Sequence, residues 1–191
     1  MKNLITDTDE EDRRLKALAE YRILGTEPES CYDDITQIAA RTCQVPISLM
    51  TLVDKDRQWF KSKVGFQTSE TRRDWSFCTH AIKENNPLIV NDAYQDKRFI
   101  NNPLVTGEPK IRFYAGFPLK NNEGNKLGTL CVIDRKPGSL DEEQCSIMEL
   151  LAKQIVSFLE LRKRSLNLLD ALSHLHNQEG ILSVCSYCRE V

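Results

Sequence analysis

The run from Ser139 to about His176 contains no glycine and no proline. Ser139 and Glu142 have the spacing of a capping box, which predicts that a helix begins there. If the whole run is helical, it is about 55 Å long at 1.5 Å per residue. That length is too great for a domain built from the rest of this chain. The helix must therefore extend beyond the domain or pair with another helix.

Hydrophobic residues recur in this run with heptad spacing. One core position holds Leu151, Phe158, Ser165 and Leu172, and the other holds Ile147, Gln154, Leu161, Leu168 and Leu175. Only Ser165 and Gln154 are polar, so the pattern predicts a seam between two copies of the chain. In the alternative interpretation, the first half packs on its own sheet and the second half frays. We expect sheet packing first and self-association beyond it, which predicts a homodimer.

The composition is that of an ordinary globular protein. The 191 residues carry a formal charge of −2, with 40% hydrophobic and 28% charged residues. There is no basic excess that would favour nucleic acid, and the longest nearly apolar run, Ile47–Val53, is too short to span a bilayer. The N-terminal segment is acidic where a secretion signal would be basic, so we expect a cytoplasmic protein without membrane insertion. Its seven cysteines are expected to be reduced thiols.

Two helices are predicted before residue 46. Thr8 and Glu11 have the spacing of a capping box for a first helix that ends near Gly25. A second helix is predicted after Pro28, and its apolar face comprises Tyr32, Ile35, Ile38 and Ala39.

Strands are predicted to follow at 47–54 and 57–65, joined by a polar turn. The second strand alternates, with Trp59, Lys61 and Lys63 on one side and Phe60, Ser62 and Val64 on the other. Residues 66–77 read as irregular. A short helix at 76–84, a strand at 87–92, a long loop at 93–110 and a hairpin of 111–120 with 126–134 complete the predicted order.

Five segments of the chain resemble the GAF domains of a bacterial signalling subgroup. They are DRQWFKS at 56–62, FCTHAI at 77–82, DAYQDKRF at 92–99, RFYAG at 112–116 and GTLCVID at 128–134. The resemblance covers about residues 10–165. It implies an α/β (α+β) fold with a central antiparallel sheet, terminal helices on one face, and loops and short helices that form a pocket on the other.

The resemblance also implies a division of the chain and a role. We expect a GAF core with N-terminal helices at 1–140, a long helix at 141–176 and a flexible tail at 177–191, cut from a longer protein with an output domain such as a kinase or cyclase. The function expected is a non-catalytic, small-molecule-sensing regulatory module that signals through paired helices. A purely structural dimerisation domain and a cyclic-nucleotide sensor remain alternatives.

Candidate ligand-binding residues follow from the sensing face of the family. Carried onto this chain, that face comprises Phe77, Cys78, His80, Asp92, Asp96, Arg98, Phe99, Arg112 and Tyr114. Arginine suits a carboxylate or phosphate, aspartate accepts from an amine, and aromatic rings supply apolar walls. Alternatively, Arg98 pairs with Asp92 or Asp96 to brace the loop, and His80 is a core residue.

Cys78 and Cys131 raise two alternatives to a non-catalytic sensor, namely a covalently bound bilin and a reductase. Bilin-binding GAF domains attach the chromophore through a cysteine that a histidine usually follows at once, but Thr79 separates Cys78 from His80 here. A free methionine sulfoxide reductase would need a nucleophilic and a resolving cysteine, and no activating base is identifiable beside Cys78 or Cys131. We therefore expect no covalent bilin, no catalytic residue and two buried apolar thiols.

The tail carries Cys185 and Cys188 with C-x-x-C spacing, which suits zinc or a redox pair. One hypothesis is that a parallel dimer brings two such pairs together around one Zn²⁺. The alternatives are an exposed tail, or a site whose other ligands lie downstream. Since only two ligands are visible in each chain, we expect no cofactor.

Overall fold

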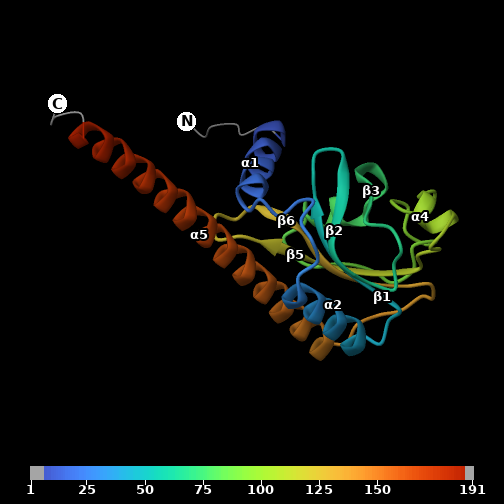
Figure 1. The fold of residues 1–191 in the computed structure, drawn as a ribbon. Helices are drawn as coiled ribbons and strands as arrows, with labels where there is room; N and C mark the ends of the chain where they lie inside the picture. The colour runs from blue at the N-terminus through green and yellow to red at the C-terminus, as the bar shows by residue number, and fades with distance from the viewer. Residues whose placement is uncertain (1–6, 188–191) are drawn as a thin grey trace, which may run out of the picture.

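The centre of the molecule is a six-stranded antiparallel sheet with strand order β3-β2-β1-β6-β5-β4 (Figure 1). The computed structural model describes residues 7–187, with side chains described for residues 8–176. The strands are β1 (Ile47–Val53), β2 (Arg57–Val64), β3 (Glu70–Arg72), β4 (Leu88–Val90), β5 (Phe113–Lys120) and β6 (Lys126–Asp134).

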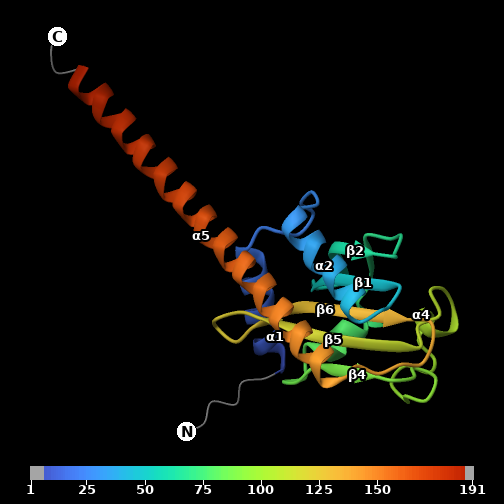
Figure 2. The same cartoon turned by 90° about the horizontal axis from the view of Figure 1, so that it is seen from below.

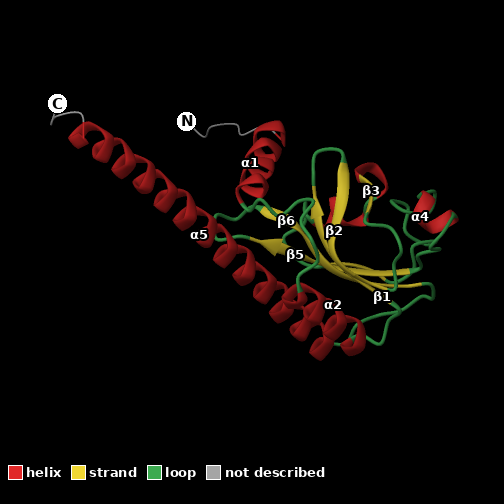
Figure 3. Ribbon diagram, viewed as in Figure 1, coloured by secondary structure: helices red, strands yellow, loops and turns green. Residues whose placement is uncertain are grey.

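Helices cover both faces of this sheet, and those on one face are longer than those on the other. They are α1 (Asp7–Glu20), α2 (Ser30–Thr42), α3 (Phe77–Ala81), α4 (Pro103–Thr106), α5 (Glu142–Tyr187) and the 3-10 turn η1 (Arg73–Trp75). Figure 2 shows α2 and α5 lying across the same face, and Figure 3 shows the short helices within the loops on the other side. The expected α+β architecture with an antiparallel sheet is thus confirmed.

The helix-covered face has an apolar core. Along α5, the fully buried residues recur at intervals of four, three and four, so that one stripe faces the sheet: Met148, Ala152, Ile155 and Leu159. Side chains of α1 and α2 join the same cluster, including Leu18 and Ile35. The first half of the long helix is therefore part of the domain.

The outer half of α5 extends beyond the domain as a single helix (Figure 1). Its side chains Leu161, Leu168, Leu172 and Leu175 are each 52–62% exposed. Polar contacts hold the helix near the point where it leaves: the Arg162 guanidinium donates to the backbone oxygen of Tyr21 at 2.9 Å, and Arg22 pairs with Asp170 at 2.6 Å. The domain contacts thus continue to residue 170, while one row of leucines stays uncovered.

Both predicted capping boxes are wrong. At the start of α5 the reciprocal bonds join Asp141 and Gln144: the backbone N–H of Gln144 donates to Asp141 Oδ1 at 2.7 Å, and the backbone N–H of Asp141 donates to Gln144 Oε1 at 3.1 Å. In α1 the Glu11 carboxylate accepts from the Arg14 guanidinium at 2.7 Å, so it is engaged elsewhere. Several acidic and hydroxyl side chains near each helix start compete for these bonds, and spacing alone does not select the winner.

Two details of the predicted faces are also wrong. Ile38 is 47% exposed, because the buried stripe of α2 runs instead through Tyr32, Ile35, Thr36, Ala39 and Ala40. In β2 the pairing register with β1 shifts, so that Lys61 bulges. Ser62 consequently lies on the helix side, where it donates to Asp33 of α2 at 2.6 Å.

Segments predicted without regular structure contain three further elements, β3, η1 and α4. β3 lies at the sheet edge, paired with β2, and α4 lies inside the long loop, where Asn102 caps its first turn. All three are four residues or shorter, below the length at which periodicity is readable. Within residues 7–187, no helix combines the length and the hydropathy needed to span a membrane.

Candidate functional site

The second face of the sheet is covered by α3 and the loop that follows β4. Its core brings together several of the predicted site residues through their rings. Phe77 stacks on Phe99 with ring centres 3.9 Å apart, and Tyr114 lies 5.0 Å from Phe77. The rings of His80 and Phe99 form a T-shaped pair with centres 4.9 Å apart. His80 is half-buried, and this burial, reinforced by the charge of Arg98, lowers its pKa. These four side chains fill the space in which a ligand was expected.

The charged candidates form two separate ion pairs at the rim. Arg112 donates to both carboxylate oxygens of Asp92 at 2.8 Å and lies over the ring of Tyr94. Arg98 pairs with Asp96 at 2.6 Å within the loop. The hydrogen bond from its arginine holds the pKa of each aspartate below its usual range. The alternative in which Arg98 braces the loop therefore describes the geometry observed.

A small cavity remains between these groups and the sheet. Its volume is about 20 Å³. A space of this size accommodates about one water molecule, far less than a nucleotide or a bilin. Its lining includes Gln58, Thr71, Cys78, Tyr114 and Cys131, together with apolar side chains. The buried hydroxyl of Thr71 has no hydrogen-bond partner.

Polar groups surround the sulfur of Cys78 at the centre of this face. The sulfur accepts from Thr129 Oγ1 at 3.0 Å, from Gln58 Nε2 at 3.2 Å and from the Tyr114 hydroxyl at 3.3 Å. Cys131 Sγ is 4.0 Å away. Both cysteines are buried, as expected, but the expectation of apolar surroundings is wrong for Cys78.

Sequence reasoning missed Gln58 and Thr129 as neighbours of this sulfur. A signal exists: Thr51 and Thr129 are directly paired on the two central strands, at positions that face α3 rather than the helix layer. Polar side chains at inward positions of buried strands need partners, and their pairing predicts a polar cluster.

Gly116 makes room for the Tyr114 hydroxyl. A Cβ atom at position 116 would lie 2.1 Å from that oxygen. Glycine weakens a strand interior, and where it occurs it often marks the close approach of another group. Here the group is the hydroxyl that donates to Cys78.

The two thiols differ in acidity. Burial raises the pKa of both, and for Cys131 the neighbouring Cys78 adds to that rise. For Cys78, hydrogen bonds from Cys131, Thr129, Thr51 and Tyr114 outweigh burial, so its pKa lies below the ordinary value. Donors aimed at a sulfur stabilise the thiolate. Cys78 is therefore the thiol of the pair that ionises first.

A larger, polar hollow of about 390 Å³ lies between α1, η1 and the β5–β6 turn. Arg73 of η1 and Arg14 of α1 both bind the Glu11 carboxylate at 2.7 Å. Burial alone would raise the pKa of Glu11, but the hydrogen bonds and charges of the two arginines lower it to about 2. This cluster ties the helix layer to the opposite side of the sheet at the ends of the strands.

No group of three or more metal-ligating side chains is arranged to hold an ion within the described part of the chain. The side chains of Cys185 and Cys188, the predicted zinc ligands, lie outside the described residues.

Residues 27–158 match the GAF domain family. The chain belongs to this family. The match covers more than half of the 191 residues and both faces of the sheet described above.

A curated relative of this GAF domain is a cyclic di-GMP phosphodiesterase of Pseudomonas aeruginosa, 37% identical over 171 residues. The alignment covers 89% of this chain and 29% of the relative. The chain thus spans less than a third of that protein's length. The relative is a signalling protein, and the likeness places this GAF domain in bacterial signal transduction.

Solved GAF structures share the fold at low identity. The GAF domain of an Acinetobacter phosphoenolpyruvate-protein phosphotransferase gives a TM-score of 0.57 at 16% identity, covering 84% of this chain and 95% of that one. The free methionine-R-sulfoxide reductase of Neisseria meningitidis, solved with its substrate, gives 0.59 at 15% identity, covering 84% and 96%. At this identity the likeness shows the fold alone.

Proposed function

We propose that this GAF domain is a regulatory module that signals through pairing of α5 between two copies of the chain. The observation that carries the proposal is the row of exposed leucines beyond the domain: Leu161, Leu168, Leu172 and Leu175. Leu161, Leu168 and Leu175 are spaced by seven residues, and Leu172 occupies the alternate core position of the same heptad. An apolar row of this kind on a single protruding helix is typical of a surface covered by a partner.

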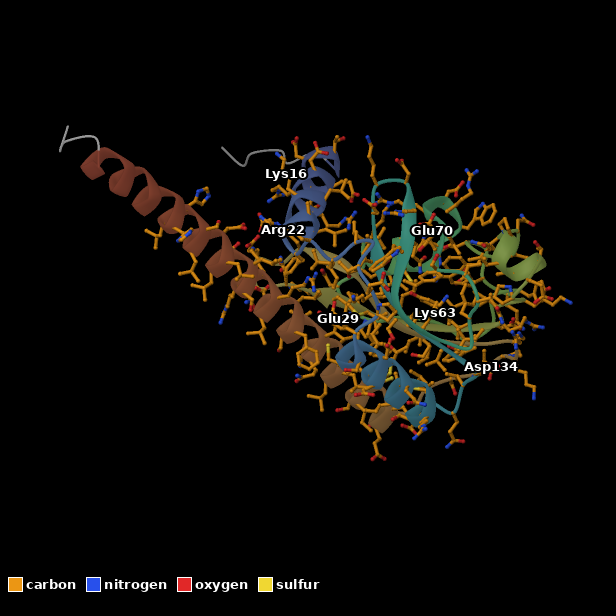
Figure 4. The ribbon with its side chains drawn as sticks, in the orientation of Figure 1. Lys16, Arg22, Glu29, Lys63, Glu70 and Asp134 are labelled. Atoms are coloured by element: carbon orange, nitrogen blue, oxygen red, sulfur yellow. The ribbon has the colours of Figure 1, made fainter. Side chains whose placement is uncertain are left out.

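The contacts at the exit point support transmission along this helix. Arg162 donates to the backbone of Tyr21 and pairs with Glu29 at 3.1 Å, while Glu29 also pairs with Lys61 of β2 at 2.7 Å. Glu29, labelled in Figure 4, lies beside α5 just before α2 begins. A change in the sheet thus has a route through buried Lys61 and Glu29 to the base of the outer helix.

Sedimentation tests the pairing. We expect a dimer of the 22.0 kDa chain at micromolar concentration. Leu168→Glu should give a monomer, because a charge in a two-stranded seam is desolvated without a partner. Asn167→Glu is the matched control, since it adds the same charge one residue away, outside the heptad core. A monomeric wild-type chain, or equal dimerisation of the two variants, would contradict the proposal.

Small-molecule sensing is the second part of the proposal. The ligand would enter where α3 meets the long loop, by separating Phe77 from Phe99, with Arg98 and Arg112 at the rim. Binding shifts a conformational equilibrium only by its differential affinity for the two states. We propose that the ligand favours one packing of α3 and the loop on the sheet, and that this packing changes the pairing of α5.

Thermal unfolding across a metabolite library, including cyclic nucleotides and cyclic di-GMP, tests the sensing role. A true ligand at 100 times its Kd stabilises the folded state by about 2.7 kcal/mol. Arg112→Ala should abolish that shift, and Lys110→Ala, a nearby exposed cation, should not. Through its relationship to a cyclic di-GMP phosphodiesterase, we propose a signalling enzyme as the output domain.

The side chains that fill the centre of the face under α3 favour the alternative of a purely structural domain. Because the cavity holds only about 20 Å³, the domain could serve as a structural dimerisation module in which side chains replace the ligand. This rival predicts a stable dimer whose unfolding temperature no compound raises. A compound whose effect is lost in Arg112→Ala would eliminate it.

A further inference from the structure

Two thiols face each other between α3 and β6. Cys78 and Cys131 are free cysteines with sulfur atoms 4.0 Å apart. A disulfide requires about 2.05 Å, so an approach of about 2 Å would join them. Cys131 lies in β6, which is paired on both sides with β1 and β5, whereas Cys78 lies in a helix of five residues. The short helix is therefore the element that would move.

The surroundings assign different roles to the two sulfurs. Three side chains donate to Cys78: Gln58, Tyr114 and Thr129, each at 3.0–3.3 Å. Such donors favour the thiolate, which is the nucleophilic form of cysteine. Cys131 lies beside this sulfur and is placed to attack an oxidised form of it.

The cavity beside Cys78 and Cys131 limits the size of the reactant that can reach them. Cys78 and Cys131 both line it, together with Gln58 and with Thr71, whose buried hydroxyl has no partner. At about 20 Å³ it has room for a small uncharged molecule but not for a cyclic nucleotide or for methionine sulfoxide. Hydrogen peroxide is an oxidant of that size, and an unpaired hydroxyl can hydrogen-bond to it.

We infer that Cys78 and Cys131 form a peroxide-sensitive dithiol. The Cys78 thiolate attacks one peroxide oxygen, the O–O bond breaks, and the departing oxygen takes up a proton and leaves as water. The product is a sulfenic acid on Cys78. The Cys131 sulfur then attacks the Cys78 sulfur, the S–O bond breaks, and a second water leaves with the Cys131 proton. Two thiols and one peroxide thus give one disulfide and two waters.

This inference goes beyond the proposed function and does not rest on it. Dimerisation depends on α5, and its failure in sedimentation would leave the thiol chemistry untouched. Likewise, a chain that forms no disulfide could still pair through its leucines. The two experiments fail separately.

Peptide mapping of the oxidised full chain is the direct test. Hydrogen peroxide at one equivalent should join tryptic peptides 74–83 and 127–135, and dithiothreitol should separate them again. Cys43, in peptide 42–55, is the internal control, because burial raises its pKa to about 11. The inference is overturned if Cys78 reacts no faster than Cys43, or if the joined peptide does not form.

Single substitutions test the two roles. In Cys131→Ser the reaction should stop at a sulfenic acid on Cys78, which dimedone traps. In Cys78→Ser the Cys131 thiol should stay unmodified. If Cys131 is instead oxidised first in Cys78→Ser, the assignment of nucleophile and resolving cysteine is wrong.

Tyr114 is a positioning residue in this scheme. Tyr114→Phe should slow oxidation of Cys78 about fivefold, the effect of losing one hydrogen bond, and shift the pH profile of the reaction to higher pH. Tyr94→Phe is the matched control, because its hydroxyl donates to the Val105 backbone oxygen and not to a thiol. Equal rates and equal pH profiles for Tyr114→Phe and the wild type would remove the donor network from the scheme.

Discussion

The two faces of the sheet are both buried, yet they are built from different chemistry. The face under α2 and α5 is filled with aliphatic and aromatic side chains such as Leu130 and Ile155. The face under α3 has a polar centre, in which Thr51, Thr129 and Gln58 surround the sulfur of Cys78. Neighbouring residues of the same strand, Thr129 and Leu130, therefore belong to opposite environments.

This difference indicates which side chains stabilise the fold and which ones control the reactivity of Cys78. Apolar burial contributes about 25 cal/mol per Å², so the apolar clusters on both faces stabilise the fold, whereas the polar centre lies on one face alone. Buried polar groups contribute little net stability once they are hydrogen-bonded, but they fix geometry. Substitution of the polar groups around Cys78 should thus alter reactivity more than stability.

The largest expected effect is on the helix-covered face. Leu130→Ala removes a fully buried side chain and should lower the free energy of unfolding by about 2–5 kcal/mol. Urea denaturation measures it. An equal loss in the neighbouring Thr129→Val would erase the distinction between the two faces.

The next largest effect is expected at Gly116. Gly116→Ala places a Cβ against the Tyr114 hydroxyl and should destabilise the fold by about 1–3 kcal/mol through overpacking. Adding Tyr114→Phe should recover part of this loss, because the closest clashing atom is gone. A double-mutant cycle measures the coupling. Strict additivity of the two changes would show that the glycine serves another purpose.

Glu11 bears on the comparison of the two faces because its carboxylate joins α1 to Arg73 of η1. Its lowered folded-state pKa of about 2 means that the folded protein binds fewer protons than the unfolded chain between pH 2 and about 4.5. Its contribution is therefore fully present above pH 4.5 and is lost as pH falls toward 2. Glu11→Gln should cost about 1 kcal/mol at pH 7, since the ion pairs are partly exposed. The variant should also show a flatter loss of stability in acid; an unchanged acid profile would contradict this.

The smallest stability effect is expected from Thr129→Val. The side chain keeps its shape but loses its hydroxyl, so the free energy of unfolding should change by less than about 1 kcal/mol. The pKa of Cys78 should nevertheless rise, because a donor to its thiolate is lost. Ultraviolet absorbance of the thiolate against pH measures the shift. A large loss of stability with an unmoved pKa would reverse the roles given to the two faces.

Much of the fold could be predicted from the sequence, because long elements carry readable periods. The 111–134 hairpin and the strands at 47–64 are predicted at nearly their observed bounds. The long helix is predicted to begin near residue 140 and to end at 176, whereas α5 continues to Tyr187. Short elements such as β3 and α4 are not predicted, since three or four residues cannot display a period. The bulge at Lys61 was missed because alternation assumes an unbroken register.

The residues of the candidate site stay a prediction, and the structure shows how they are grouped. Phe77, Phe99 and Tyr114 do lie together under the loop. The charged candidates instead pair with each other at the rim, as Asp92 with Arg112 and Asp96 with Arg98. Sequence spacing says which chemistry is present in a loop, but only the folded geometry decides which partners satisfy it.

Among the described side chains of α5, Leu159 is the last that is fully buried. The contacts beyond it, which continue to Asp170, are polar and partly exposed, and the leucine row continues to Leu175. The 16 steps from Leu159 to Leu175 make an arm of about 24 Å, at 1.5 Å per residue. A tilt of about 5° at the base then moves Leu175 by about 2 Å, comparable to the 1–2 Å helix shifts that switch subunit interfaces. A displacement of the sheet too small to open a cavity would therefore be large enough, at the far end of the arm, to change which leucines meet in the proposed dimer.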